Sequence, residues 1–179
     1  MNESKISARY AKALLLLGKE QNIQEEIRAD VESLSELINK TPEVRKLFEI
    51  PNIRTSLKLE IINKLFKDAF NPVMLSFLAL VVKNNRELFL PSILRIYIDL
   101  FKKDNKIKSA VLTTARPVNR EIRSIIKDYI SKEFDSNIEL SEKVDDRLIG
   151  GFILKIEDQQ INASVSNHLD RIQKELLSV

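Results

Sequence analysis

The chain has 179 residues, of which 44% are hydrophobic and 31% are charged, so it can bury a core as one domain or as two small ones. It contains no cysteine, which excludes disulfides, thiolate zinc sites and cysteine nucleophiles. Its 29 Lys and Arg against 26 Asp and Glu give a net charge of +3, and the two signs are interspersed. A nucleic-acid-binding protein usually carries a concentrated basic stripe, so a solvated mixed surface is favoured here.

The composition signals few chain reversals. Only three glycines and five prolines are present, which favours long helices over a many-stranded barrel. The longest nearly apolar run, residues 73–82, is too short for a membrane-spanning helix, which needs about 20 apolar residues. The first residues lack the apolar core of a signal peptide. We therefore expect a soluble, intracellular chain that reaches a membrane only through a partner.

The first 105 residues are predicted to form a bundle of five or six helices with short connections. Apolar residues recur there at the spacing of one helix face. The predicted faces are Ile6, Tyr10, Ala13, Leu14 and Leu17; Ile27, Val31, Leu34, Leu37 and Ile38; Val44, Leu47 and Phe48; Leu57, Ile61, Leu65, Phe66 and Ala69; and Leu88, Leu94, Tyr97, Ile98 and Phe101. The segment at residues 73–82 is apolar almost all round, which indicates a helix that is central or covered by a partner.

Helix boundaries are signalled by asparagine, threonine and proline. Thr41 and Asn71 can each cap a helix whose first position is the following proline, where a missing N–H has no consequence. Asn84 and Asn85 tolerate the left-handed conformation that ends a helix when glycine is absent. Pro91 falls in the first turns of the sixth helix, where a proline does least damage.

Beyond residue 105 the pattern changes period. Residues 107–115 and 138–144 alternate as strands do, and residues 152–161 read as a hairpin that turns at EDQQ. One helix begins after Asn119, and a last helix completes the chain. Their predicted faces are Ile122, Ile125, Ile126, Tyr129 and Ile130, and Val165, Leu169, Ile172 and Leu176. The fold class is therefore mainly α, with a helical bundle at residues 1–105 and a small α/β domain at residues 106–179 ordered strand, helix, strand, hairpin, helix.

No catalytic constellation is recognisable. His168 is the only histidine and has no cysteine or second histidine to share a metal. Asp145 and Asp146 lack the surrounding pattern of a calcium loop and are more typical of a turn. Gly150 and Gly151 lack the frame of a phosphate-binding loop and open a strand instead of a helix. We expect no enzyme activity, no metal and no cofactor.

Apolar surface is the remaining candidate for function. The first helix interleaves Ala8, Ala11 and Ala13 with larger apolar residues, and its ALLLL run places leucines on more than one face. For a single helix of this kind, a wide face packed in the core is a sufficient explanation of the leucines on more than one side. Two such helices, the first and the fifth, make a groove for a partner's amphipathic helix more plausible.

Four segments match a known family. They are ARYAKALLLL near the start, NNRELFLPSILRIYIDLF in the sixth helix, AVLTTARPV after the domain boundary, and VDDRLIGGFILKIEDQQINASVSNHLDRI near the end. In this order and spacing they resemble the delta subunit of the rotary F-type ATP synthase, called the oligomycin-sensitivity-conferring protein in mitochondria. The resemblance runs from end to end, and the last segment is its most specific part.

The resemblance implies a non-catalytic stator subunit that acts as a monomer within the complex and does not bind nucleic acid. In the family, the helical domain grips the N-terminal helix of an alpha subunit, and the C-terminal domain holds the membrane-anchored b subunits of the peripheral stalk. Carried over by position, the groove comprises Tyr10, Ala13, Leu14 and Leu17 with Phe77, Leu80, Val81 and Asn84. The stalk contact is expected at Leu169, Ile172 and Leu176 of the last helix. The chain is of bacterial type, without a transit peptide, and is expected at the cytoplasmic face of the cell membrane.

Four residues depart from the family pattern. Asn162 and Ala163 stand where the family often has Asp-Gly, Asn167 where it often has a basic residue, and Asn85 where it often has glycine. These departures concern local geometry, since none of them touches a catalytic group. Two other hypotheses stay open at this point, a free-standing helical adaptor and a weakly basic nucleic-acid-binding module.

Gly150 and Gly151 have an architectural interpretation. A glycine inside a strand commonly marks a bulge or a close approach of two backbones. We interpret the pair as a bend that lets the small sheet pack under both helices of the C-terminal domain, and we assign it no ligand.

Overall fold

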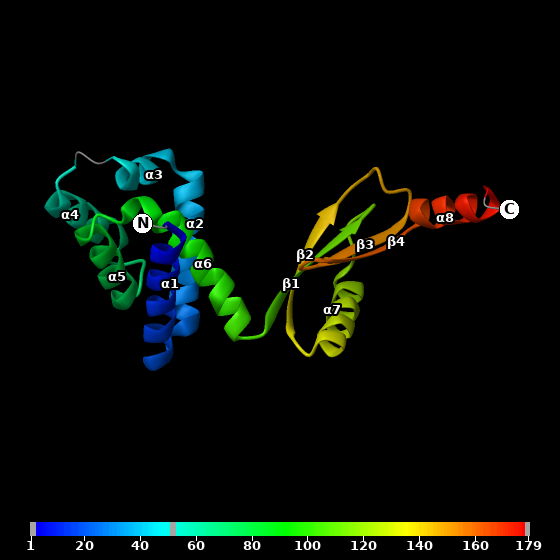
Figure 1. The fold of residues 1–179 in the computed structure, drawn as a ribbon, viewed down its shortest axis with the longest axis horizontal. Coiled ribbons are helices and arrows are strands. Elements are labelled where there is room, and N and C mark those ends of the chain that lie inside the picture. Colours follow the sequence, from blue (N-terminus) through cyan, green and yellow to red (C-terminus); the bar gives the residue numbers. More distant parts are fainter. Residues whose placement is uncertain (1–2, 51–52, 178–179) are drawn as a thin grey trace. The chain divides into compact units, whose positions relative to one another are not determined.

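The computed structural model describes residues 3–50 and 53–177 (Figure 1). It divides the chain into two compact units, Met1–Phe101 and Lys102–Val179. The helix that ends the first unit continues to Asp104, and the first strand of the second unit begins at Ile107. The mainly helical fold class is confirmed, and the domain boundary between residues 105 and 106 stays a prediction.

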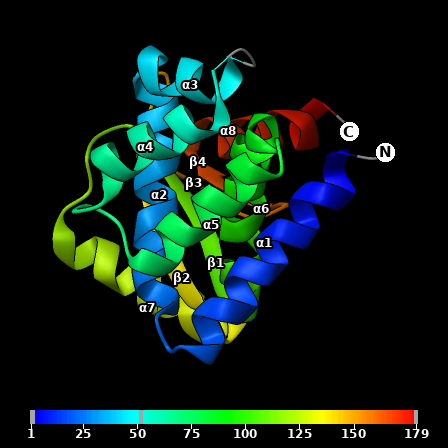
Figure 2. The ribbon, with the colours of Figure 1, turned by 90° about the vertical axis from the view of Figure 1, so that its left-hand side faces the viewer.

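The N-terminal unit is a bundle of six α-helices and one short 3₁₀ turn among its described residues. In chain order these are α1 (Glu3–Glu20), α2 (Gln24–Lys40), α3 (Pro42–Glu49), α4 (Thr55–Phe66), α5 (Pro72–Lys83), η1 (Glu87–Phe89) and α6 (Leu90–Asp104). Its core takes side chains from all of them, and the largest fully buried ones include Leu14, Ile27, Leu34, Met74 and Tyr97. Figure 2 views this unit from the side on which both α1 and α5 lie.

Asn71 fastens the start of α5 to α2. Its side-chain oxygen accepts a hydrogen bond from Val73 N at 2.9 Å, as predicted for an N-cap. Its backbone N donates to Asp30 Oδ2 at 2.8 Å, and its side-chain Nδ2 donates to Glu26 Oε2 at 2.7 Å. One residue therefore both begins α5 and holds that end against α2.

The other predicted helix ends have mixed outcomes. Asn85 has φ +53°, which confirms the left-handed ending of α5. Thr41 precedes Pro42 as expected, but its side chain makes no capping hydrogen bond. The position of a helix start was thus predictable, whereas the side-chain contact depends on a rotamer that the pattern does not encode.

The predicted inner face of α4 is right at Phe66, which is buried, and wrong at Leu57 and Leu65, which are 49% and 55% exposed. Lys58 and Ile62 are buried in their place. This face includes a lysine because Lys58 Nζ lies 2.6 Å from Glu87 Oε1, and the paired charges are both buried. Leu88 is likewise 63% exposed, because the 3₁₀ turn η1 rotates it outward and buries Glu87 instead.

The C-terminal unit contains one four-stranded sheet in the order β2-β1-β3-β4. Its elements are β1 (Ile107–Thr114), α7 (Arg120–Phe134), β2 (Asn137–Val144), β3 (Gly151–Ile156), β4 (Gln159–Ser164) and α8 (Val165–Leu177). β1 and β2 are parallel, and β1–β3 and β3–β4 are antiparallel. The predicted order of strand, helix, strand, hairpin and helix is confirmed, as is the Asn119 cap, whose Oδ1 accepts from Ile122 N at 2.9 Å.

Helix α7 covers the sheet and α8 does not. The core of this unit is formed by Ala110, Leu112, Ile130, Ile138, Leu140, Leu154 and Ile156, with Val118, Ile126, Phe134 and Phe152 packed against it. No described side chain of α8 belongs to this core, and α8 leaves the end of β4 away from the sheet (Figure 1). The expectation that both helices pack on the sheet is therefore wrong for α8.

Gly151 lies where two backbones nearly touch. It begins β3 with φ +78°, and a Cβ atom built on it would lie 2.2 Å from the backbone oxygen of Ala163 in β4. The same atom on Gly150 would meet only Val165 Cγ2, at 3.2 Å. The β3 and β4 backbones thus approach closely at Gly151, and the requirement for glycine falls on this residue of the pair. The interpretation of the pair as a bend stays a prediction.

Candidate functional site

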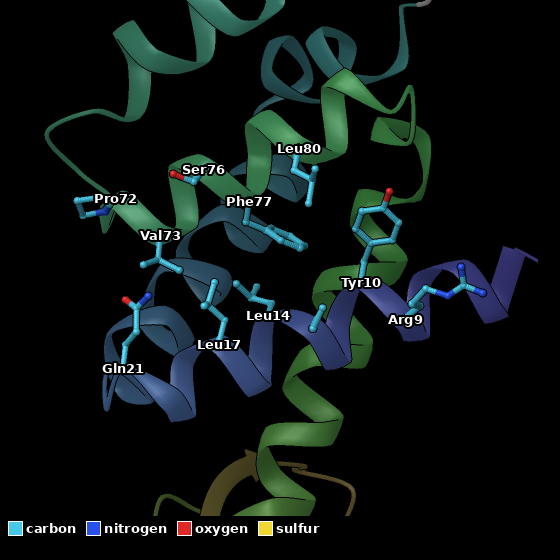
Figure 3. Close-up of a pocket in the computed structure, with 11 residues that line it drawn as sticks. Arg9, Tyr10, Leu14, Leu17, Gln21, Pro72, Val73, Ser76, Phe77 and Leu80 are labelled. Atoms are coloured by element: carbon cyan, nitrogen blue, oxygen red, sulfur yellow. The ribbon is translucent and has the colours of Figure 1, made fainter.

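A groove of about 580 Å³ lies between α1 and α5 (Figure 3). We call it the α1/α5 groove. It is lined by Arg9, Tyr10, Ala13, Leu14, Leu17, Gln21, Pro72, Val73, Ser76, Phe77 and Leu80. Most of these side chains are apolar; Arg9 comes from α1, and Gln21 comes from the turn that directly follows it.

The apolar surface of α1 is wide enough to serve the core and the groove at once. Ile6, Ala11, Leu14 and Leu15 are buried in the bundle. Ala13 and Leu17 are exposed on the adjoining side, which forms one wall of the groove. An amphipathic helix of a globular protein usually buries a single stripe, so this additional apolar side is surplus to the bundle.

The opposite wall comes from α5. Phe77 is almost fully buried, whereas Leu80 is 50% exposed at the rim. Val73, Ser76 and Leu80 recur at the spacing of one helix face. Because Asn71 ties the start of α5 to α2, this wall has a defined position relative to the rest of the bundle.

Tyr10 connects the two walls. Its ring meets the Phe77 ring edge-on, with 6.3 Å between centroids and an interplanar angle of 68°. Asn84 Nδ2 donates a hydrogen bond to the Tyr10 hydroxyl at 3.1 Å. The aromatic contact and the hydrogen bond together fix the Tyr10 side chain across the end of the groove.

Six of the eight predicted groove residues line the groove: Tyr10, Ala13, Leu14, Leu17, Phe77 and Leu80. Asn84 lies beside it through its contact with Tyr10. Val81 does not line it, because its side chain is 1% exposed and packs in the bundle core. The apolar run of α5 gave no signal to separate Val81 from its neighbours, since nearly every position of that helix is hydrophobic.

Prediction missed Arg9, Gln21, Pro72, Val73 and Ser76. Val73 lies four residues before Phe77, and Gln21 lies four residues after Leu17. Extending the same helical spacing by one turn at each end would have found both of them.

The second unit carries exposed apolar side chains on its last helix. Leu169 is 55% exposed and Val165 is 43% exposed. The side chains of Ile172 and Leu176, which the sequence also assigned to a stalk contact, lie outside the described residues. His168 is exposed on the same helix.

Asp145 has a local partner. Arg147 donates to its carboxylate from Nε and Nη2 at 2.9 Å each and from its backbone N at 3.1 Å. These side-chain and backbone hydrogen bonds lower the pKa of Asp145 to about 2. Across the described residues, no group of three or more His, Cys, Asp or Glu side chains could hold a metal ion. Asp145 is thus a turn residue whose carboxylate is paired with Arg147.

None of the helices among the described residues is long and apolar enough to cross a membrane. The surface with the strongest indication of a binding role is the α1/α5 groove, because its lining is mostly apolar. Its chemistry suits the apolar stripe of a helix that lies between two others.

Comparison with known proteins identifies the family. Residues 6–176 match the family described as ATP synthase delta (OSCP) subunit. ATP synthase subunit delta of Christiangramia forsetii is 32% identical over 176 residues, which are 98% of this chain and 95% of that protein. The subunit delta of Parabacteroides distasonis is 33% identical over 177 residues, which are 99% and 98% of the two chains.

A solved structure has the same fold. A chain of the Toxoplasma gondii mitochondrial ATP synthase hexamer superimposes with a TM-score of 0.69 at 22% identity, and the match covers 96% of this chain and 97% of that one. Both domains are included in a match of this extent. The chain therefore belongs to the ATP synthase delta (OSCP) subunit family.

Proposed function

We propose that the α1/α5 groove binds the N-terminal helix of an alpha subunit, and that the C-terminal domain holds the b subunits of the peripheral stalk. Membership of the family makes the chain a non-catalytic stator subunit of an ATP synthase. The finer proposal concerns which surfaces perform the linkage. It also places the chain peripherally, at the cytoplasmic face of the cell membrane, through these partners.

The groove is the observation that carries the first half of the proposal. An amphipathic helix binds such a groove by apolar side chains spaced three and four residues apart. The two walls supply apolar side chains along their length, from Leu17 and Val73 to Tyr10 and Leu80. Such a helix would cover Leu80, which is otherwise half exposed.

The second half rests on the exposed apolar residues of α8. Leu169 lies on a stripe that the sequence continues to Ile172 and Leu176. An unpaired apolar stripe on a helix is typical of a protein–protein contact. A stator that joins the catalytic head to the stalk needs one such contact in each domain, because torque from the rotor must pass through both.

A peptide titration tests the groove. A synthetic peptide of the cognate alpha subunit's N-terminus is added to the full chain, and amide signals are followed by NMR. We expect signals of α1 and α5 to shift, with α3 signals unmoved. Unshifted α1 and α5 signals at saturating peptide would refute the groove assignment.

Ala13→Trp sharpens this test. The Ala13 side chain is exposed and lines the groove, so a tryptophan there fills the site without entering the core. We expect lower peptide affinity and lower coupled ATP synthesis at unchanged helix content. Ala8→Trp is the matched control, because Ala8 is also exposed on α1 but lies outside the groove.

The family match over residues 6–176 favours the stator subunit over a free-standing adaptor or a nucleic-acid-binding module. Nucleic-acid binding would show a steep dependence on salt concentration. Tight binding of that kind by the pure chain would reopen the alternative.

A further inference from the structure

The two ends of the α1/α5 groove differ in charge. Arg9 lines the groove at the end crossed by Tyr10, and the uncharged Gln21 lines it at the other end. Arg9 is exposed and makes no hydrogen bond or ion pair with another described residue. Its side chain extends from α1 toward the N-terminus of that helix, as is usual for helical residues (Figure 3). An unpaired guanidinium therefore lies at one end of a mostly apolar surface.

No acidic side chain of the two walls neutralises Arg9. The charged residues of α1 and α5 are Glu3, Lys5, Arg9, Lys12, Lys19, Glu20 and Lys83. Glu20 lies about 16 Å from Arg9 along the helix axis, and Glu3 lies about 9 Å from it in the other direction. Both separations exceed the Debye length of about 8 Å at physiological salt, so these charges are screened from Arg9.

Arg9 is also the cation best placed to contact a bound helix. Lys5 and Lys12 are its exposed neighbours on α1, four and three residues away, but neither lines the groove. Lys83 of α5 is exposed and lines a smaller hollow on the α4 side of that helix. The three lysines add positive charge around the Tyr10 end, and of these four cations Arg9 alone borders the apolar lining.

The end of the groove at Gln21 is surrounded mainly by acids. Within four residues of Gln21 or Asn71, or hydrogen-bonded to Asn71, are the acids Glu20, Glu25, Glu26, Asp30 and Asp68 and the lysines Lys19 and Lys67. A carboxylate on a bound helix is therefore favoured at the Tyr10 end and disfavoured at the Gln21 end.

Apolar walls alone do not fix the register of a bound helix. The apolar stripe of such a helix repeats every three to four residues, so a shift by one turn replaces one apolar contact with another. A charge at one end of the groove removes this degeneracy, because a shifted or reversed helix would carry its carboxylate away from the guanidinium. Charged residues beside the apolar seam set register and partner choice in coiled coils in the same way.

We propose that Arg9 selects the bound helix by charge: the helix carries an aspartate or glutamate beside the apolar residues that pack at Tyr10 and Leu80, and this carboxylate pairs with the Arg9 guanidinium. The proposal rests on the proposed binding of an alpha-subunit helix in the groove and adds the residue that sets its register. Arginine suits this role, since its planar guanidinium can bind a carboxylate through two parallel hydrogen bonds.

Arg9→Gln and Lys12→Gln are a matched pair of variants in the full chain. Each removes one exposed positive charge from α1, but only Arg9 lines the groove. The synthetic peptide of the cognate alpha subunit's N-terminus is titrated calorimetrically into the native chain and both variants. We expect Arg9→Gln to bind about threefold to fivefold more weakly, as is typical of a lost exposed ion pair, and Lys12→Gln to stay within about twofold.

A set of altered peptides identifies the partner carboxylate. Each Asp or Glu of the peptide is replaced singly by Asn or Gln. One of these peptides should bind the native chain about threefold to fivefold more weakly than the unaltered peptide does. The same peptide should bind the Arg9→Gln variant as well as the unaltered peptide does, because the two changes remove one shared interaction.

A charge exchange separates pairing from a purely structural role of Arg9. Arg9→Glu should bind the unaltered peptide about tenfold more weakly, since two like charges then meet. Replacement of the identified carboxylate by lysine should restore most of the affinity, which would also show that the variant is folded. A lysine peptide that binds Arg9→Glu no better than the unaltered peptide does would overturn the pairing.

The failure of this proposal differs from the failure of the groove assignment. If the unaltered peptide does not bind the native chain, both are overturned. If it binds but Arg9→Gln and Lys12→Gln weaken it equally, the effect belongs to the general charge of α1, and selection by Arg9 is overturned while the groove assignment stands. The same conclusion follows if no single carboxylate of the peptide couples to Arg9.

Discussion

Lys58 Nζ lies 2.6 Å from Glu87 Oε1 inside the N-terminal bundle, and the two residues are 2% and 8% exposed. The pair joins α4 to the 3₁₀ turn that follows α5. The second carboxylate oxygen of Glu87 has no hydrogen-bond partner among the described residues. The ion pair therefore holds the turn in place while leaving part of the charge of Glu87 uncompensated.

Lys58→Met should destabilise the N-terminal unit strongly. Removal of one partner of a buried ion pair leaves the other charge unpaired, which costs about 3 to 5 kcal/mol. Urea unfolding followed by circular dichroism measures the loss. The double variant Lys58→Met with Glu87→Leu should recover most of it, since an apolar pair of similar volume is often neutral. Equal destabilisation of the single and double variants would contradict this account.

Tyr10→Ala and Tyr10→Phe should differ in alpha-peptide affinity. The alanine variant loses the ring that contacts Phe77 and should bind the peptide at least about tenfold more weakly, as is typical of an aromatic anchor. The phenylalanine variant loses only the hydrogen bond from Asn84, worth about 1 kcal/mol, and should stay within about fivefold. Calorimetric titration separates the two, and equal losses would show that the hydroxyl matters more than the ring.

Gly151→Ala should destabilise the C-terminal unit, and Gly150→Ala should not. A Cβ on Gly151 would lie 2.2 Å from the Ala163 oxygen at φ +78°, so strain of at least about 2 kcal/mol is expected. Gly150 is the matched control, since its Cβ would meet only a side-chain methyl group at 3.2 Å. Hydrogen exchange of the β3 and β4 amides measures the difference. Equal protection in both variants would mean that the β3–β4 backbone relaxes freely.

Arg147→Ala should raise the pKa of Asp145 from about 2 toward the usual aspartate range, because the hydrogen bonds from the guanidinium are lost. A carboxyl group with a lowered pKa contributes stability above its unfolded-state pKa and loses it as pH falls through the folded-state value. That contribution should therefore fade between about pH 4 and pH 2 in the native chain. Carboxyl carbon NMR titration measures the pKa. Lys143→Ala should move it less, since Lys143 contributes only a weaker charge interaction.

Tyr97→Phe should leave the bundle as stable as before or stabilise it by up to about 1 kcal/mol, because the buried hydroxyl has no hydrogen-bond partner within the described residues. Burial raises the pKa of Tyr97 to about 12, with a smaller contribution from the charge of Glu25. The native chain should lose stability as pH rises from about 10 to 12, since the unfolded tyrosine ionises first. Urea unfolding at neutral and alkaline pH tests both points, and a less stable phenylalanine variant at neutral pH would reveal a hidden partner of the hydroxyl.

Features decided within a few residues were predictable from the sequence. The Asn71 and Asn119 caps, the left-handed Asn85 and the order of strands and helices all follow from local chemistry. The burial of Lys58 on α4 was not predictable, because it depends on a carboxylate 29 residues away. The exposure of apolar residues on α7 and α8 depends on which part of the sheet each helix covers, and that information is tertiary.

The groove was predictable in outline only. The two helices that form it were identified from their apolar pattern and from the family resemblance. Six of the eight predicted residues line the groove. Val81 could not be separated from its neighbours by pattern, since core and groove positions on α5 are equally hydrophobic. Only tertiary packing distinguishes the core face of α5 from its groove face.

Both ends of α5 are held before any partner arrives. Asn71 bonds its first turn to Asp30 and Glu26 of α2, and Asn84 at its end bonds to Tyr10 of α1. A groove whose walls are already set needs little conformational reordering on binding, so the entropic cost falls mainly on the incoming helix. Association should then proceed at the rate of oriented diffusional encounter, and differences in residence time should arise from the dissociation step.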